Sequence, residues 1–562
     1  MKKSNSKKWM LIVFILLSCT TFIAQAADNR RFQVSKNLDY FNLVFKDIDL
    51  FYVDSLNPEK TIQTAISAML KTLDPYTEFY AEEEATDFKT MISGNYGGIG
   101  AVISGYKNGQ VIVSEPYKGM PADRYGLRAG DVILEIDGQT TKGKAIGEVT
   151  KLLRGQSGSS FQIKIQRPGE KKAQDIKIVR SAIQVPSVPY YAKMKNQTGY
   201  ILLTTFTGNP SKEFKDAFLA LKKQGITSLI IDLRENGGGL LEEAVSIANY
   251  FLPKGKEIVS TRGRNKKIES TFKTTNMPLD TEIPLTVLIN EGSASASEIL
   301  AGALQDLDRA VIIGQRSFGK GLVQNTRNLP YGAKLKITTA KYYIPSGRCV
   351  QALDYTNRGK DGKVKEIPDS LTTLFHTAAG REVRDGRGIM PDVSVEEKEM
   401  PTLVYALDNS IDSLKNVFDF ATEYRLHHSQ IAPAEEFTIS DEDYAAFKKQ
   451  LKVSGFTYDM RSEKLLKQLK ETINLEGYSE QTSSAIKQLE DALQHNLDKD
   501  LDFFAKDIKR LLCTEIVTRY QYQTGGICAS LREDPVLKKA IEVLNNKEDY
   551  KKTLSATAPK IK

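Results

Sequence analysis

A lysine set between glycines is the first residue that suggests chemistry, in the stretch GQRSFGKG at residues 314–321. Gly, four residues, then Gly-Lys is the spacing of a phosphate-binding loop. Such a loop also needs a Ser or Thr after the lysine and a helix beginning there. Here Gly321 follows Lys320, and residues 322–344 are rich in β-branched and aromatic side chains, which predicts a hairpin. The nucleotide-binding interpretation therefore fails, and Lys320 needs another role.

A run of serines, SASASE at residues 293–298, follows an apolar stretch and a glycine turn and opens a predicted helix. Orphan amides and the helix dipole favour negative charge at such an N-terminus. A nucleophilic serine there would have its neighbour's amide available to stabilise an oxyanion. The alternative is plain helix capping, in which a serine at the N-cap is followed by an acid in the first turn.

A serine nucleophile needs a base, and no histidine lies near this run in the sequence, although folding could bring a remote one close. Ser-Lys dyads are a known variant of the catalytic triad. The lysine must be neutral to accept a proton, and burial among apolar groups lowers its pKa. Lys320 has Phe318, Leu322 and Val323 nearby in the sequence, so we interpret it as a general base.

A second glycine-rich break, DLRENGGG, occupies residues 232–239 between an apolar strand and a helix. Three consecutive glycines allow close backbone approach and leave amides free. Strands and helices alternate from about residue 185 to residue 400, which predicts an α/β core with a largely parallel sheet. Sites in such sheets lie at the carboxyl ends of the strands, where both breaks fall.

Residues 94–181 predict a compact mixed domain whose order of strands and helices, with GLRAGDVILEIDG at its centre, closely resembles a PDZ domain. A peptide would add a strand between the segments 100–104 and 145–155. Backbone amides would receive the peptide's carboxylate at Tyr96, Gly97, Gly98, Ile99 and Gly100. The helix carries apolar residues that would line the pocket or form its core-facing side, namely Ile146, Val149, Leu152 and Leu153.

The N-terminus has a basic start, an apolar segment at residues 9–17 and a small-x-small motif ending at Ala26, which predicts a cleaved secretory signal. A lipoprotein signal with Cys19 as the lipidated residue is the alternative. Removing the first 26 residues, with four lysines and no acid, takes the formal charge from +8 to +4. No basic tract with interleaved aromatics occurs, so a nucleic-acid partner is not indicated.

Processing after Ala26 would leave Cys349, Cys513 and Cys528, an odd number that excludes a fully paired disulfide framework. Cys513 and Cys528 would either pair or stay as free thiols. The sequence has no CxxC, no HExxH and no Cys/His cluster, so no metal and no cofactor is expected. Residues 33–90 look helical up to a turn at DPYTEFY. After residue 400 the chain is charged and helical, with a tail expected to be disordered.

The motifs GSASASEI, GQRSFGKGLVQ and DLRENGGG, together with a PDZ domain, resemble the C-terminal processing (tail-specific) peptidases over roughly residues 60–400. The resemblance implies that Ser295, the middle serine, is the nucleophile and that Lys320, 25 positions later, is its base. Gln324 would orient the lysine. The amides of Ala296 and Gly238 would form the oxyanion hole.

One departure concerns Gly237, where the family usually has proline, so that either Gly238 or Gly239 would supply the oxyanion amide. By the same resemblance, Arg154 would communicate substrate binding from the PDZ domain to the core, or it is a surface arginine that ends a helix.

The predicted architecture is multidomain α/β, with a ClpP/crotonase-like protease core, an inserted PDZ domain, and helical regions at both ends. The expected boundaries are 1–26 signal peptide, 27–90 N-terminal helical region, 91–182 PDZ domain, 183–400 Ser-Lys protease core and 401–562 C-terminal helical region.

The predicted activity is that of an exported, periplasmic or envelope-associated serine endopeptidase acting on unfolded or C-terminally tagged proteins. An adaptor protein, a lipid anchor and a homo-oligomer are further candidate partners. A non-catalytic peptide-binding scaffold and a binder of small hydrophobic ligands are the competing functions.

Overall fold

The computed structural model describes residues 29–85, 88, 94–359, 362–396, 399–408, 416–493 and 496–555. The predicted signal peptide and Cys19 lie outside these residues. The chain divides into two compact units, one of residues 1–82 with 326–337 and the other of residues 83–325 with 338–562.

The first unit contains a helix over residues 29–51 and α2 (Pro58–Lys71), which begins at the N-cap Asn57, whose side chain accepts from the Lys60 amide. Both helices were expected. The predicted turn at DPYTEFY is wrong in part, because β1 (Glu78–Tyr80) lies there and pairs antiparallel with Lys334–Lys336 of β18. Its strand partner is more than 250 residues away, so local sequence carried no sign of it.

A six-stranded sheet forms the centre of the second unit, and its strands run parallel except for the first. This confirms the largely parallel sheet predicted from the alternating pattern. The order across the sheet is β10 (Tyr190–Lys193), β11 (Thr198–Leu202), β12 (Ser228–Asp232), β15 (Leu285–Ile289), β16 (Val311–Gly314) and β23 (Val393–Ser394).

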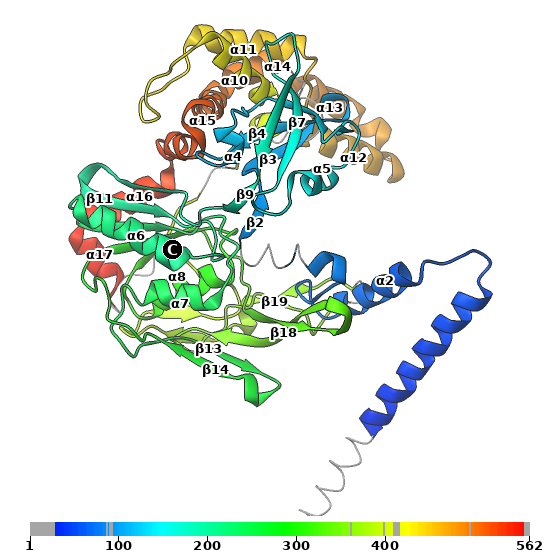
Figure 1. Ribbon diagram of the computed structural model, residues 1–562. Helices are drawn as coiled ribbons and strands as arrows, with labels where there is room; N and C mark the ends of the chain where they lie inside the picture. The colour runs from blue at the N-terminus through cyan, green and yellow to red at the C-terminus, as the bar shows by residue number, and fades with distance from the viewer. Residues whose placement is uncertain are drawn as a thin grey trace, which may run out of the picture. The chain divides into compact units, whose positions relative to one another are not determined.

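Helices cover both faces of this sheet, which explains why β12 and β15 are buried along their whole length. One face packs in a large apolar core with α6 (Pro210–Lys223), α7 (Leu241–Ala248) and α8 (Ala296–Asp306). The other face packs against α16 (Pro535–Asn545), which the chain reaches only near its end (Figure 1). The last helices therefore complete the protease core rather than forming only a separate module.

A second, antiparallel sheet contains β13 (Glu257–Gly263), β14 (Ser270–Lys273), β17 (Leu322–Asn328) and β18 (Lys334–Tyr343). β17 and β18 pair as the hairpin predicted after Lys320, so a strand and not a helix follows that lysine. Two small ribbons lie further along the chain, β19 (Leu353–Asp354) with β20 (Lys365–Glu366), and β21 (Leu374–His376) with β22 (Glu382–Arg384).

The PDZ region contains a sheet in the order β3 (Ala101–Tyr106), β4 (Gln110–Pro116), β5 (Val132–Ile136), β7 (Ser160–Gln166) and β8 (Gln174–Val179). The short β6 (Gln139–Thr140) pairs with β5. Helices α4 (Pro121–Arg124) and α5 (Ile146–Leu153) fall where the sequence placed them. A two-stranded ribbon of β2 (Asn95–Gly98) and β9 (Ser181–Gln184) lies at the two ends of the region.

The segment after residue 400 is helical, as predicted, and forms its own apolar core. The expected disordered tail is wrong at its start, because α17 (Lys547–Thr553) includes the first tail residues; residues 556–562 lie outside the described part. The helices before α16 are α9 (Thr402–Asp408), α10 (Asn416–His427), α11 (Asp441–Val453), α12 (Arg461–Leu475), α13 (Ser479–Ala492), α14 (Leu497–Phe503) and α15 (Ala505–Leu531).

Candidate active site

Three loops meet at one edge of the central sheet, each leaving the carboxyl end of a parallel strand. β12 leads into the glycines of residues 237–239, β15 into the serine run, and β16 into the segment that carries Lys320. Because these strands are neighbours, their carboxyl ends lie side by side, which is where open α/β sheets place their sites. The sheet topology thus brings together the three motifs that the sequence singled out.

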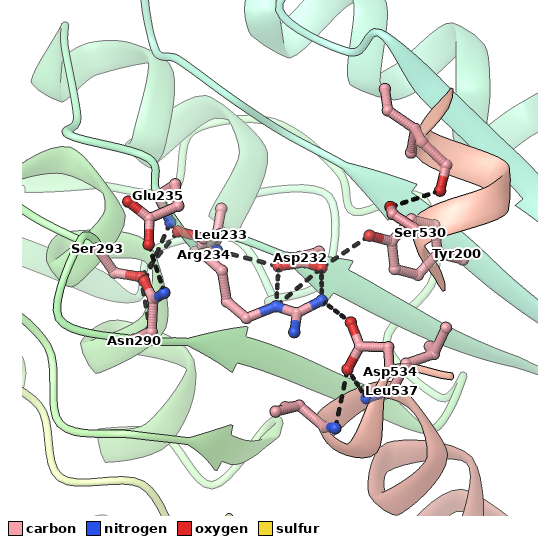
Figure 2. Close-up of polar contacts among 12 residues, drawn as sticks. Tyr200, Asp232, Leu233, Arg234, Glu235, Asn290, Ser293, Ser530, Asp534 and Leu537 are labelled. Carbon is pink, nitrogen blue, oxygen red and sulfur yellow. Dashed lines mark hydrogen bonds and ion pairs between the residues drawn. The ribbon is translucent and has the colours of Figure 1, made fainter. Parts of the chain in front are cut away.

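Burial separates the three serines of the run. The hydroxyl of Ser293 accepts from the Asn290 amide at 3.0 Å and donates to the Leu233 carbonyl at 2.8 Å, as Figure 2 shows, and Ser293 is fully buried. Ser297 is also fully buried and donates to the carbonyl of Asn236 at 2.8 Å. Ser295 is only half-buried. The outer two serines are therefore structural, and the middle serine is the least buried of the three.

The backbone of Ser295 is strained. Its φ of 57° and ψ of −112° lie outside the regions that non-glycine residues favour. Ser295 is the N-cap of α8, so the amide of Ala296, the first residue of the helix, belongs to the donors that a helix cannot pair internally. A strained serine at a strand-to-helix turn is a recurring arrangement for nucleophiles, because it presents the side chain outward.

Gly238 lies directly against this turn. A Cβ at this position would fall 2.7 Å from the Ala294 carbonyl and 2.9 Å from the Ala296 nitrogen, and φ is +98°, so only glycine fits. The Gly238 amide donates to Oδ1 of Asn236 at 2.9 Å. That bond must open before this amide can hold an oxyanion. The role of Gly238 or Gly239 in an oxyanion hole therefore stays a prediction.

Glu298 connects the serine run to the lysine loop. Its fully buried carboxylate accepts from the amides of Ser295 at 2.8 Å and Lys320 at 2.9 Å through Oε2. Through Oε1 it accepts from the Ser317 hydroxyl at 2.6 Å and the Gly319 amide at 2.7 Å. Burial raises the pKa of Glu298, and these four donors oppose that shift.

Lys320 lies between β16 and β17 and is half-buried. The loop around it is held by backbone contacts, since the Phe318 amide donates to the Ser293 carbonyl at 3.0 Å and the Gly321 amide to Oε1 of Gln351 at 2.8 Å. Gln324, on β17, donates to Oγ1 of Thr338 at 3.2 Å. Its role in orienting Lys320 stays a prediction.

An ionic cluster lies at the end of β12, the strand that leads toward the glycine loop. Arg234 donates to both carboxylate oxygens of Asp232, and it also donates to Asp534, the N-cap of α16, at 2.6 Å (Figure 2). The Tyr200 hydroxyl donates to Asp232 at 2.7 Å. Burial alone would lower the pKa of Arg234, but the two carboxylates outweigh it and hold the pKa above its usual value. The cluster ties the end of β12 to the last part of the chain.

The predicted carboxylate-binding segment of the PDZ domain lies partly in β2 and partly in the link between β2 and β3. Tyr96, Gly97 and Gly98 belong to β2 and pair with β9. Ile99 is buried in the PDZ core, and its carbonyl accepts from the Ala122 amide, while Gly100 has φ +68° just before β3. β3 ends the order of the PDZ sheet, so it offers the edge that strand addition needs.

The predicted pocket residues on α5 differ in exposure. Val149 is fully buried and Leu153 nearly so, whereas Ile146 is half-buried beside the same core. Arg154 ends α5 and stacks over the ring of Tyr96, with its Cζ 4.9 Å from the ring centroid. In this conformation Val149 and Leu153 support the core, and Ile146 has surface left for a ligand.

Among the described residues, no group of His, Cys, Asp and Glu side chains is arranged to hold a metal ion, and no helix is long and apolar enough to cross a membrane. Cys349, Cys513 and Cys528 are all free thiols, which decides between the two alternatives left open for the last two.

Comparison with known proteins identifies the family. Residues 197–356 match the model for peptidase family S41, residues 112–167 a PDZ domain, and residues 407–544 the C-terminal helical domain of a probable PDZ-protease. The chain is 34% identical over 455 residues to a probable CtpA-like serine protease of Staphylococcus aureus strain COL, covering 78% of this chain and 87% of the relative.

The chain belongs to peptidase family S41. A homologue of the same name from S. aureus strain MRSA252 is 38% identical over 362 residues, covering 62% of this chain and 72% of that protein. Among solved structures, the photosystem II D1 C-terminal processing protease is 27% identical, with a TM-score of 0.36, over 64% of this chain and 93% of that chain. The predicted family, the architecture and the serine-peptidase class are confirmed.

Sequence reasoning missed two features of this S41 site. Glu298 was seen only as an acid in the first turn of a capped helix, which is a correct but incomplete description, because its carboxylate also binds the lysine loop. The hydrogen bond from the Gly238 amide to the Asn236 side chain was not foreseen at all. Asn236 stands two residues before that glycine, a spacing at which an Asn side chain can bond its own backbone, and this was the one available signal.

Proposed function

We propose that this chain is an exported serine endopeptidase in which Ser295 and Lys320 form the catalytic dyad. The observation that carries the proposal is that Glu298 links the two residues. One of its carboxylate oxygens, Oε2, accepts from the backbone amides of both Ser295 and Lys320. Ser295 is also the half-buried member of the serine run and stands at a strained helix N-terminus.

The chemistry needs no group beyond the chain. Neutral Lys320 takes the proton of the Ser295 hydroxyl, whose oxygen attacks the scissile carbonyl. The Ala296 amide, at the first position of α8, and a glycine amide of residues 238–239 stabilise the oxyanion. The tetrahedral intermediate expels the amine, which takes the proton from Lys320. Water then hydrolyses the acyl-enzyme, and Ser295 regains its proton.

Substrates are captured by their C-terminal ends in the PDZ domain. β3 provides the free sheet edge, Ile146 the apolar contact, and the segment from Tyr96 to Gly100 the amides for the carboxylate. Arg154, which stacks on Tyr96, couples the filled groove to the rest of the domain. Unfolded or tagged proteins, with free ends, fit this mode of capture.

The test uses an active-site-directed fluorophosphonate, which labels an activated serine without requiring knowledge of the natural substrate. We expect wild-type protein to be labelled at Ser295, located by mass spectrometry of the peptides, and Ser295→Ala and Lys320→Ala to remain unlabelled while folded. Lys223→Ala, on the exposed side of α6, is the matched control for loss of a lysine. Equal labelling of Lys320→Ala and wild type would refute the dyad.

Cleavage is followed in parallel with an unfolded protein that ends in apolar residues. We expect truncation of the PDZ-captured protein by the wild type and none by either dyad variant. Binding without cleavage or labelling would favour the scaffold function instead. The mature N-terminus, measured by mass spectrometry of protein recovered from the producing cell, tests export, with cleavage after Ala26 expected and a lipidated Cys19 as the alternative.

A further inference from the structure

The buried carboxylate of Glu298 has a larger role than helix capping requires. A capping acid needs only the N-cap amide, yet Glu298 accepts four hydrogen bonds, of which three come from the segment Ser317–Lys320. Those three donors lie 19 to 22 positions further along the chain. Glu298 therefore joins two loops that leave different strands of the sheet.

The two carboxylate oxygens of Glu298 bind different donors. Oε2 accepts from the amides of Ser295 and Lys320, so one atom holds the backbone of both members of the proposed dyad. Oε1 accepts from Ser317 and Gly319 and anchors the approach to the lysine. Bonds from N–H and O–H donors to a charged oxygen are stronger than neutral ones, and the N-terminus of α8 favours the negative charge.

Glu298 holds a strained residue. The φ of 57° at Ser295 has an energetic cost that the surroundings must offset, and the bond from its amide to Oε2 is a direct restraint on that peptide. The wholly buried Tyr342 adds a weaker contact, donating from its hydroxyl to the Ser295 carbonyl at 3.3 Å. The strained turn and the lysine loop thus share one buried anchor.

We propose that Glu298 is a positioning residue that fixes the two loops relative to one another, so that the Lys320 base lies within reach of the Ser295 nucleophile. It has no exposed surface, so it would act on the reaction through the two loops and not by contact with a substrate. This inference rests on the proposed dyad. Loss of the carboxylate lowers the rate of the chemical step and leaves capture of substrate unchanged, because the PDZ groove and the active-site loops are built from different residues.

The decisive variant is Glu298→Gln, which keeps shape and volume. A glutamine offers one carbonyl oxygen to four donors, and its NH2 group faces either the Ser295 and Lys320 amides or the Ser317 hydroxyl and Gly319 amide, so two of the four bonds are lost. Misplacement of reacting groups by about 1 Å costs about 100-fold in rate. We expect kcat to fall about 100-fold with KM within twofold of wild type, and fluorophosphonate labelling to slow in parallel.

Asp392→Asn is the matched control. Its side chain is 10% exposed, and its carboxylate accepts from the Ile312 amide, Gln305 and Arg381, away from both loops. We expect it to lower the melting temperature at least as much as Glu298→Gln and to keep kcat within threefold. A second variant, Ser317→Ala, removes one donor to Oε1 and should lower kcat about 3- to 10-fold even if Glu298→Gln fails to fold.

Each outcome decides something. A Glu298→Gln enzyme with wild-type kcat, or a Ser317→Ala enzyme with wild-type kcat where Glu298→Gln does not fold, overturns the positioning role. A loss of kcat that Asp392→Asn reproduces at equal stability shows a purely structural residue. Failure of the wild type to label at Ser295 overturns the proposed dyad and this inference together, whereas a labelled wild type with an unaffected Glu298→Gln overturns only the inference.

Discussion

The loops around Ser295 and the peptide-facing elements of the PDZ domain, β3 and α5, hold their residues by different physical means. The Ser295 loops are fixed by buried hydrogen bonds to Glu298, Asn236 and Ser297, with a glycine where no side chain fits. The PDZ elements rely on apolar packing behind a free sheet edge and a half-buried side chain on α5.

The difference follows from what each region has to do. A reacting pair tolerates little displacement, so its backbone is held by directional bonds in a place that excludes water. A recognition groove must accept peptides with different C-terminal sequences. Unpaired backbone N–H and C=O groups at a sheet edge, together with non-directional apolar contacts, allow that. We therefore expect small changes in the loops to alter kcat and changes in the groove to alter binding.

The largest expected effect comes from Gly238→Ala. The added methyl would meet the Ala294 carbonyl and the Ala296 nitrogen at under 3 Å, at a φ that L-residues avoid. We expect kcat to fall at least about 100-fold in a steady-state peptidase assay. Gly237→Ala is the control, because a Cβ there meets nothing within 4 Å, and it should stay within about threefold. Equal activity of both variants would show that the turn is not tightly fixed.

A smaller effect is expected from Ser297→Ala, which deletes the buried hydroxyl that holds the Asn236 carbonyl. We expect the free energy of unfolding to fall by about 1–2 kcal/mol in urea titration, with a several-fold loss of kcat. Ser246→Ala, whose exposed hydroxyl donates to Glu242 within α7, should change stability by less than about 0.5 kcal/mol. If the two variants unfold alike, the hydroxyl of Ser297 is not a structural anchor.

Two substitutions on α5 test whether its residues support the PDZ core or bind the peptide. Val149→Ala leaves a cavity in the core and should lower the free energy of unfolding by about 2 kcal/mol. Ile146→Ala removes a half-buried group and should weaken binding of an apolar-ended peptide about fivefold by calorimetry, with kcat unchanged. A loss of kcat in Ile146→Ala would mean that the groove also controls the active site.

The smallest effect concerns Cys349, whose sulfur lies against Gly321 beside the lysine loop. Burial raises the pKa of this thiol, so little thiolate exists at pH 8 and alkylation by iodoacetamide should be slow compared with denatured protein. Because the raised pKa disfavours the thiolate only in the folded state, its contribution to stability is present below the ordinary thiol pKa and falls as pH rises above it. Rapid labelling at pH 8 would contradict the tight packing of this loop.

Much of the architecture was predictable because its signals are local. The PDZ strands and helices, the parallel sheet and the hairpin after Lys320 were foreseen from periodicity and turn residues, which depend on near neighbours. β1 and α16 were not, because their partners are distant in sequence. α16 packs its apolar face on a sheet that ends about 140 residues earlier, and its pattern is that of any amphipathic helix.

The sequence by itself determined which residue types stand at the ends of the strands: a serine run, a lysine among glycines, and three consecutive glycines. It also carried the PDZ pattern and, through resemblance, the family. The resemblance pointed to Ser295 within the run, but only the tertiary structure showed that Ser293 and Ser297 are buried, and only it joined Ser295 to Lys320 through Glu298. The reason is physical, since burial and hydrogen bonds between loops exist only once neighbouring strands bring distant segments to one edge of the sheet.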